Sequence, residues 1–131
     1  MLNILFEDNH LLILNKKSGE LSQGDITNDK TLVDKAKSYL KAKYNKKGNV
    51  FIGLVHRLDR PTSGVIVLSK TSKSLRRMND KFKMNEISKV YWAVTNSFNK
   101  NEGKVESFLK KNQKQKLNYL VLQMNLGLSL S

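Results

Sequence analysis

The stretch HRLDRPTSG at residues 56–64, followed by the apolar run VIVL at residues 65–68, decides the fold. Proline fixes its own backbone φ and glycine accepts angles that other residues avoid, so the proline and glycine of this stretch predict a turn around its Thr-Ser pair. The four apolar residues that follow, three of them β-branched, predict a short strand buried on both faces. Asp59 is therefore expected on a rigid loop at the edge of a sheet, where its carboxylate lies between two arginines and suits a nucleophile or a base.

The same stretch, continued to Lys70, resembles the signature of the RluA-type pseudouridine synthases. That signature is H-R-L-D-R-x-T-S-G, followed by an apolar strand and a lysine, and the match is nearly residue for residue. The motif is long and mixes charged, turn and apolar positions, which makes it specific. The resemblance implies isomerisation of uridine to pseudouridine within structured RNA, without a cofactor and without a metal.

The charge of the chain also indicates a nucleic-acid partner. Its 131 residues include 24 Lys and Arg against 11 Asp and Glu, which gives a net charge of +13. The excess lies in residues 35–131, which carry 21 bases and five acids, whereas residues 1–34 carry three bases and six acids. A one-sided positive excess is typical of proteins that neutralise phosphates. The alternative is a lysine-rich proteome in which many surfaces are basic.

The length and composition of the chain exclude several other classes of protein. A chain of 131 residues is long enough for one small domain and too short for two, which predicts a single domain over residues 1–131. The absence of cysteine excludes a disulfide framework and a thiolate metal site. No apolar run approaches the length of a membrane span, and the N-terminus lacks the pattern of a signal peptide. We therefore expect a cytoplasmic protein with no membrane partner.

Two amphipathic helices are expected. Thr31 and Asp34, a hydroxyl followed three residues later by a carboxylate, predict a capping box before a helix over residues 32–45. A second helix, capped by Thr71 or Ser72, is expected over residues 72–84. Its apolar stripe is Leu75, Met78 and Phe82. Its exposed face is strongly basic, and we predict that this face contacts the RNA backbone; the alternative is a solvated helix face. The basic residues of that face are Lys73, Arg76, Arg77 and Lys81.

Apolar runs predict the remaining strands. They span residues 1–6, 11–14, 88–94, 103–110 and 117–124. With the two helices, these strands predict an α+β fold, in which a mixed, mainly antiparallel sheet has two flanking helices. After the second strand, Asn15-Lys16 and Gly19 fit the family's opening pattern Asn-Lys-Pro-x-Gly, with Lys17 where proline is usual.

The resemblance assigns roles to individual residues. Asp59 corresponds to the catalytic aspartate, which acts on a uridine flipped out of the RNA. Arg57 would fill the space left by the flipped base, and Arg60 would steady the loop or bind phosphate. A Lys-x-Tyr-x-Ala pattern that resembles the family's second motif places Tyr91 against the target base. His56 would contact the RNA or serve the structure, because a chain with two histidines predicts no metal site.

The resemblance covers the first part of the family's catalytic domain. Family domains continue into a third motif, Arg-x-His-Gln-Ile-Arg, whereas this sequence stops at residue 131 before any such motif. We therefore expect a truncated, incomplete pseudouridine synthase catalytic domain. We also expect an unpaired sheet edge near residues 117–130, which favours self-association.

The sequence leaves more than one function open. The first is isomerisation of uridine in RNA, with ribosomal RNA slightly preferred over transfer RNA. The second is a catalytically incompetent RNA-binding remnant of such an enzyme, which uses the basic helices without turnover. The third is a general basic domain that binds DNA or a ribosomal surface. Replacement of Asp59 by alanine distinguishes the first two, because it should abolish modification and leave binding intact.

Overall fold

The computed structural model describes residues 1–94, 96, 102–105, 110–112, 117–119 and 124–127. The chain divides into two compact units, residues 1–89 and residues 90–131, and each is described by itself.

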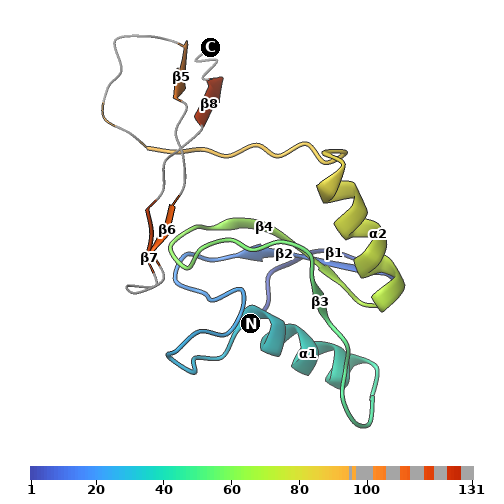
Figure 1. Cartoon of the computed structure of the whole chain (residues 1–131). Coiled ribbons are helices and arrows are strands. Elements are labelled where there is room, and N and C mark those ends of the chain that lie inside the picture. The colour runs from blue at the N-terminus through green and yellow to red at the C-terminus, as the bar shows by residue number, and fades with distance from the viewer. Residues whose placement is uncertain (95, 97–101, 106–109, 113–116, 120–123, 128–131) are drawn as a thin grey trace. The chain divides into compact units, whose positions relative to one another are not determined.

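The first unit is a four-stranded sheet with two helices (Figure 1). The strands are β1 (Ile4–Glu7), β2 (Leu11–Lys16), β3 (Gly53–Leu54) and β4 (Gly64–Ser69). Their order in the sheet is β1-β2-β4-β3, and each neighbouring pair is antiparallel. The helices are α1 (Leu32–Lys43) and α2 (Ser72–Lys83). The predicted α+β fold, an antiparallel sheet with two flanking helices, is confirmed.

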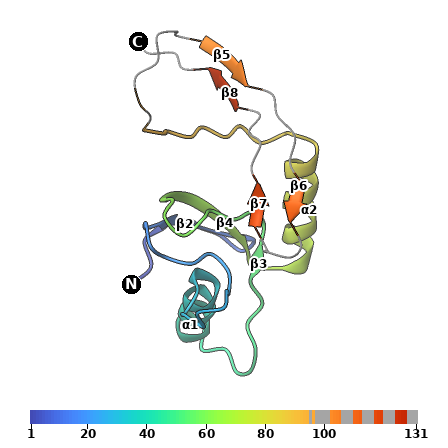
Figure 2. The ribbon, with the colours of Figure 1, turned by 60° about the vertical axis from the view of Figure 1, so that its left-hand side comes forward.

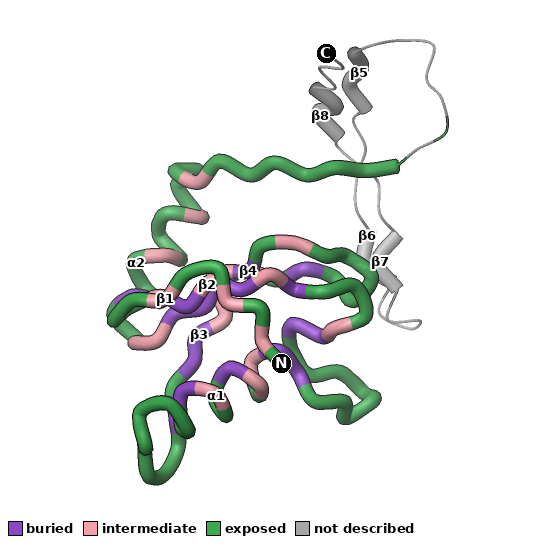
Figure 3. The backbone as a smooth tube through the Cα atoms, turned by 180° about the vertical axis from the view of Figure 1, so that it is seen from behind, coloured by how far each residue is buried: buried purple, intermediate pink, exposed green. Residues whose placement is uncertain are grey.

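The core lies between the sheet and α1. Alternation along β2 and β4 directs Leu12, Leu14, Ile66 and Leu68 to one face, and all four side chains are fully buried. α1 covers this face with apolar residues at helical spacing, namely Leu32, Ala36 and Leu40. The buried parts of the backbone in Figure 3 include stretches of β2, β4 and α1. Removal of this apolar surface from water holds α1 to the sheet.

α2 packs on the opposite face of the sheet. Gly53 in β3 has no side chain, and a Cβ at this position would lie 2.8 Å from Cδ2 of Leu75 in α2. The adjacent Leu54 packs against the core on the α1 side, so Gly53 and Leu75 meet on the other side. In both views the two helices lie on different sides of the sheet (Figure 1, Figure 2). Glycine therefore allows the close approach of α2 to β3.

The prediction that the strand after the turn is buried on both faces is wrong for one face. Ile66 and Leu68 are fully buried against α1, but Val65 is 56% exposed and Val67 is only partly buried. An apolar run is buried on both faces only where both faces are covered along its whole length. α2 packs on this face, but it leaves Val65, at the end of β4 next to the turn, open to solvent.

Both helices begin where the sequence predicts. Oγ1 of Thr31 accepts a hydrogen bond from the backbone N of Asp34 (3.1 Å), and the Asp34 carboxylate accepts one from the backbone N of Thr31 (3.0 Å). α2 begins in the same way, with Thr71 as N-cap and Ser74 as its reciprocal partner. Both helices end within two residues of the predicted ends. In the part of the chain that the structure describes, no helix is long and apolar enough to cross a membrane.

The described residues of the second unit form four short strands. β5 (Glu102–Val105) pairs antiparallel with β8 (Met124–Gly127), and β6 (Lys110–Asn112) pairs antiparallel with β7 (Leu117–Tyr119). These strands overlap the ranges predicted at 103–110 and 117–124, parts of which lie outside the described residues. The predicted free edge near residues 117–130 also lies partly outside them and stays a prediction.

The prediction of a strand over residues 88–94 is wrong. This segment is not part of any described strand, and Tyr91 is 63% exposed and Trp92 96% exposed. Aromatic and β-branched residues favour a strand where a neighbouring strand supplies hydrogen bonds and packing. None of the described strands pairs with residues 88–94. The hydrogen bonds and packing that a strand needs are therefore not supplied by any described strand.

Glu7, at the end of β1, ties the sheet to α1. Its Oε2 accepts hydrogen bonds from Tyr39 (2.8 Å) and Lys43 (2.9 Å) of α1. Its Oε1 accepts hydrogen bonds from Tyr44 (2.8 Å), which follows α1, and from Lys70 (2.9 Å), which follows β4. Burial raises the pKa of this carboxyl, but the four hydrogen bonds outweigh burial and bring the pKa to about 2. The ionised form of Glu7 is therefore part of the folded structure.

Replacement of Glu7 by Gln is expected to lower the free energy of unfolding by about 2–3 kcal/mol at neutral pH. The unfolded chain takes up a proton at a higher pH than the folded protein does. The stabilisation is therefore present above the ordinary pKa of 4.5 and is lost as the pH falls toward about 2. Urea unfolding at a series of pH values measures both effects. In the control Glu86→Gln, whose ion pair with Lys81 is half exposed, we expect a change below about 0.5 kcal/mol, and equal effects of the two substitutions would contradict this account.

Candidate active site

Asp59 lies on the loop between β3 and β4, five residues before β4 begins. The backbone N of Thr62 donates to the backbone O of Asp59 at 2.9 Å, which closes a turn with Arg60 and Pro61 at its centre. The turn is thus centred two residues earlier than the sequence predicts. Gly64, where β4 starts, has a φ of +141°, a value that residues with a side chain rarely adopt. Glycine therefore allows the chain to pass from the turn into the strand.

A single neighbouring segment, residues 16–22, holds the backbone of this loop. Each backbone carbonyl from Leu58 to Thr62 accepts at least one hydrogen bond from the 16–22 segment. The bonds run from Ser22 Oγ to Leu58 (2.7 Å), from Lys16 Nζ to Asp59 (3.1 Å), Arg60 (3.1 Å) and Thr62 (2.6 Å), from Gly19 N to Arg60 (2.8 Å), and from Ser18 Oγ to Pro61 (2.8 Å). Consecutive carbonyls fixed in this way leave the loop backbone little freedom.

Lys16 is the main donor of this arrangement. It is the last residue of β2 and is fully buried, and its ammonium donates to Lys17 O (3.2 Å) as well as to the three loop carbonyls. Burial lowers the pKa of Lys16, whereas the negative charges of Glu20 and Asp59 raise it. Carbonyl dipoles compensate a buried ammonium without neutralising it. Lys16 therefore fixes the loop and also brings a positive charge into the electrostatic range of Asp59.

Asp59 itself is exposed. Within the described part of the chain its carboxylate takes part in none of the ion pairs and accepts none of the side-chain hydrogen bonds. A carboxylate that is open to solvent on a loop with a fixed backbone can meet a ligand without prior rearrangement.

The two arginines that flank Asp59 differ in their contacts. Arg60 donates through Nε to Gly19 O (3.1 Å) and through NH2 to Oδ2 of Asp29 (2.8 Å), and NH1 lies 3.9 Å from Oδ2 of Asp25. Of the two roles predicted for Arg60, these contacts favour steadying the loop over binding phosphate. Arg57 is exposed, and among the described residues it forms no ion pair.

His56 makes contacts inside the protein. Its Nε2 accepts a hydrogen bond from the backbone N of Val67 in β4 at 3.0 Å. Its ring stacks on Phe82 of α2, with 5.1 Å between the ring centroids and 25° between the planes. Burial lowers the pKa of His56, and the charge of Lys89 lowers it further. Of the two roles predicted for His56, these contacts favour the structural one.

The other predicted RNA contacts lie on two different parts of the chain. The basic side chains predicted on α2 are all exposed, namely Lys73, Arg76, Arg77 and Lys81. Lys81 pairs with Glu86 at 3.1 Å, and the other three form no ion pair with the described residues. Tyr91 belongs to the second unit, and its side chain is exposed. Its place beside the target base stays a prediction.

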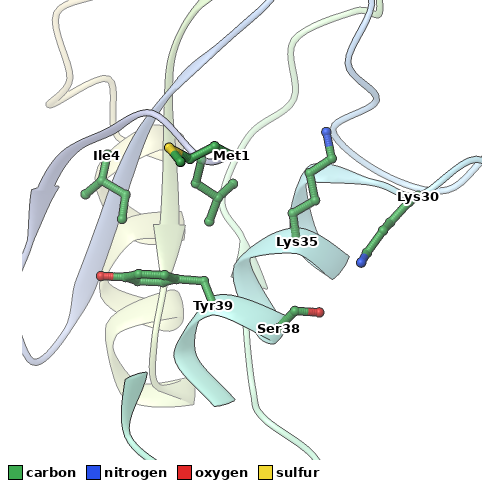
Figure 4. A pocket seen from close by; sticks show the side chains of 7 residues that line it. Met1, Ile4, Lys30, Lys35, Ser38 and Tyr39 are labelled. Carbon is green, nitrogen blue, oxygen red and sulfur yellow. The ribbon is translucent and has the colours of Figure 1, made fainter. Parts of the chain in front are cut away.

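A pocket of about 370 Å³ opens elsewhere, between the N-terminal residues and α1 (Figure 4). Its lining includes Met1, Ile4, Lys30, Lys35, Ser38 and Tyr39. None of the lining residues comes from residues 56–64 or from the 16–22 segment, so the pocket is not part of the site around Asp59. In the part of the chain that the structure describes, no three His, Asp or Glu side chains are grouped so that they could hold a metal ion.

Sequence reasoning missed Lys16, Ser18 and Ser22 as parts of the site. One signal was available for Lys16. Leu12, Leu14 and Lys16 alternate along β2, which places the lysine at a core position of a half-buried strand. A lysine is rarely buried without a specific set of partners, so its presence there points to an ordered group of acceptors. The two serines carry no comparable signal, because their partners lie 36 or more residues away in the sequence.

Comparison with protein families gives one match over most of the chain. The model of a family described as RNA pseudouridylate synthase matches residues 10–125. This range contains the loop with Asp59, the 16–22 segment and α2.

Individual relatives agree with the family match. The chain is 33% identical over 123 residues to ribosomal large subunit pseudouridine synthase D of Borreliella burgdorferi, covering 90% of this chain and 37% of that protein. It is 32% identical over 106 residues to tRNA pseudouridine synthase C of Pectobacterium carotovorum, covering 81% and 27%. A solved structure, human RNA pseudouridylate synthase domain containing 4, matches with a TM-score of 0.54 and 26% identity over 64% of this chain and 30% of that one. The chain spans about a third of the length of such curated relatives.

Proposed function

The chain belongs to the RNA pseudouridylate synthase family, and we propose on that premise that it isomerises uridine to pseudouridine in structured RNA with Asp59 as the catalytic carboxylate. The observation that carries this proposal is the geometry of residues 58–62. The 16–22 segment holds every backbone carbonyl of this stretch, while the carboxylate of Asp59 is exposed.

The chemistry requires a negative group beside the sugar. In the isomerisation the bond from C1′ to N1 of uracil breaks, the base turns, a bond from C1′ to C5 forms, the hydrogen of C5 leaves as a proton, and N1 takes up a proton from the solvent. One proton is lost and one is gained, so the product is an isomer and no oxidant or reductant is needed. Positive charge develops at C1′ as the base departs, and a carboxylate held at this carbon lowers the energy of that state. Asp59 supplies this carboxylate on a loop that does not have to be ordered first.

The neighbouring residues take supporting roles in this proposal. The uridine leaves the RNA stack to reach Asp59, and Arg57, exposed two residues earlier, fills the gap by stacking its planar cation on the remaining bases. Arg60 holds the loop through Gly19 and Asp29.

The basic face of α2 follows the RNA backbone. Lys73, Arg76 and Arg77 are exposed and form no ion pair with the described residues, so their charges are available to phosphates. Phe82 of α2 stacks on His56, which directly precedes Arg57, so this face belongs to the same rigid part of the fold as the loop. Lys81 contributes less to phosphate binding in this proposal, because its charge is already paired with Glu86.

Joint replacement of Arg76 and Arg77 by alanine is expected to weaken RNA binding about tenfold at moderate salt. The slope of the logarithm of affinity against the logarithm of salt concentration should fall by about 1.5, because two phosphate contacts are lost. Filter binding or fluorescence anisotropy over a range of salt concentrations measures both values. The control is Lys37→Ala, which removes an exposed charge from α1 instead. If the control weakened binding per charge as much as the double variant, RNA would recognise the overall charge of the chain and not α2.

Incubation with RNA tests the proposed reaction. Ribosomal and transfer RNA are incubated separately with the 131-residue chain and digested to nucleosides, and pseudouridine is separated from uridine by chromatography. We expect an increase in pseudouridine, larger with ribosomal RNA. Relatives named for the large ribosomal subunit and for tRNA are both similar to this chain, so the two RNAs are compared directly. Salt-sensitive binding without any pseudouridine would contradict the proposed reaction and support an RNA-binding protein without turnover.

A further inference from the structure

His56 takes the place of a backbone acceptor between β3 and β4. The register of these two strands, continued by one residue, would bring Val55 opposite Val67. β3 ends at Leu54, however, and the backbone N of Val67 donates to Nε2 of His56 instead. A side chain thus satisfies a donor in the interior of the sheet that the short strand leaves unpaired.

The same ring also contacts α2. It stacks on Phe82, which lies in the last turn of the helix, and Nζ of Lys89 lies 5.8 Å from the centroid of the Phe82 ring. In the sequence, His56 directly precedes Arg57 and lies three residues before Asp59. One side chain therefore links the start of the loop that carries Asp59 to β4 and to the basic helix.

The contact with Val67 needs a neutral imidazole. Nε2 accepts a hydrogen bond only through its lone pair, which assigns the ring proton to Nδ1. Protonation would place an N–H on Nε2, facing the N–H of Val67, and the bond would be lost. Lys89 is the charged group that acts on the ring among the described residues. Val67 and Phe82, which contact the ring from β4 and α2, do not titrate.

We propose that His56 is a positioning residue of this site, and that its protonation releases the start of the Asp59 loop from β4 and from α2. The consequence for turnover rests on the function proposed above, because a displaced loop carries Asp59 away from the sugar. Turnover then falls in acid through a group that does not touch the RNA.

The pH range of this effect follows from the pKa. Burial and Lys89 lower the pKa of His56 in the folded protein, so the unfolded chain takes up the proton first. The stabilisation of the fold by neutral His56 is complete above the ordinary histidine pKa of about 6.5. It is lost as the pH falls from this value through the lowered pKa of the folded protein. Several carboxyl groups have lowered pKa values and stay ionised in this range, namely those of Glu7, Asp8, Glu20, Asp25 and Asp34.

NMR of the imidazole nitrogens tests the positioning role without any enzymatic assay. We expect His56 in the Nδ1–H tautomer, with a titration midpoint below the ordinary value of about 6.5. The amide of Val67 should be protected from exchange above the midpoint of His56, and its protection relative to the intrinsic exchange rate should be at least about tenfold lower below it. A His56 in the Nε2–H tautomer, or one whose titration midpoint is not below the ordinary value, would overturn the proposal whatever the RNA assay shows.

The pH profile of pseudouridine formation tests the consequence. His56→Gln keeps an acceptor near the position of Nε2 but does not titrate, and His56→Leu removes the acceptor. At one pH unit below the His56 midpoint found by NMR, we expect the wild type and His10→Gln to have lost turnover about tenfold relative to pH 7, and His56→Gln to have lost less than about twofold. His56→Leu should be slow throughout. If His56→Gln lost as much turnover at low pH as the wild type, the proposal would be overturned. If the wild type forms no pseudouridine at any pH, the proposed function has failed, and the NMR result alone decides the positioning role.

Discussion

Replacement of Lys16 by methionine is expected to lower turnover by about a hundredfold or more. Methionine keeps most of the buried aliphatic stem but lacks the ammonium that donates to three loop carbonyls. The carbonyl of Thr62 then loses its donor, whereas those of Asp59 and Arg60 keep bonds from Thr62 N and Gly19 N. A displacement of about 1 Å at the proposed catalytic carboxylate is enough for a loss of this size.

The effect of the same substitution on stability should be smaller. Lost hydrogen bonds cost about 1–3 kcal/mol, and part of this is offset because an ammonium no longer has to be buried. Urea unfolding measures the free energy, and hydrogen exchange of the Thr62 amide reports on the turn. The matched control is Lys17→Met, which changes the adjacent, exposed lysine and should leave both values unchanged. Unchanged turnover in Lys16→Met would show that the buried ammonium does not position the loop.

Replacement of Asp59 by asparagine is expected to lower pseudouridine formation by about 10³-fold or more. The amide has the same shape but no charge, so it cannot stabilise the positive sugar carbon. The loop should keep its structure, because none of the bonds that anchor it to the described residues involves the Asp59 side chain. RNA affinity should stay within about twofold or rise, because a negative charge near phosphates has been removed.

The control for this substitution is Asp80→Asn. Asp80 is an exposed carboxylate on α2, so its loss changes the net charge by the same amount. Nucleoside analysis and binding measurements are made on both variants and on the wild type. Equal turnover by the wild type and Asp59→Asn would remove Asp59 from the catalytic role, whereas a loss of RNA binding in Asp59→Asn alone would indicate a role in recognition.

Local signals in the sequence predict much of the first unit. The capping box of Thr31 and Asp34 and the N-cap at Thr71 mark the starts of both helices, because these bonds join residues three apart. The apolar runs of β2 and β4 predict the sheet. The position of Asp59 next to a turn could also be predicted, because proline restricts the backbone and glycine accepts angles that other residues avoid.

Long-range contacts account for what the sequence did not predict. The donors to the loop come from residues 16–22, and the acid that pairs with Arg60 is Asp29, 31 residues away. No short pattern encodes such a pairing. The segment over residues 88–94 has the composition of a strand, but strand formation depends on a partner that composition does not specify. Val65 is similar, since its exposure depends on where α2 stops covering β4.

Release of tritium from RNA labelled at uridine C5 tests the central claim most directly, because the C5 hydrogen is lost only when the new bond from C5 to C1′ forms. The assay compares the wild-type chain with Asp59→Asn on the same RNA at the same salt concentration. This account predicts tritium in the solvent in proportion to the pseudouridine formed by the wild type, and release near background from Asp59→Asn. Binding of RNA by both proteins with no release from either would contradict the claim that this loop carries out the isomerisation.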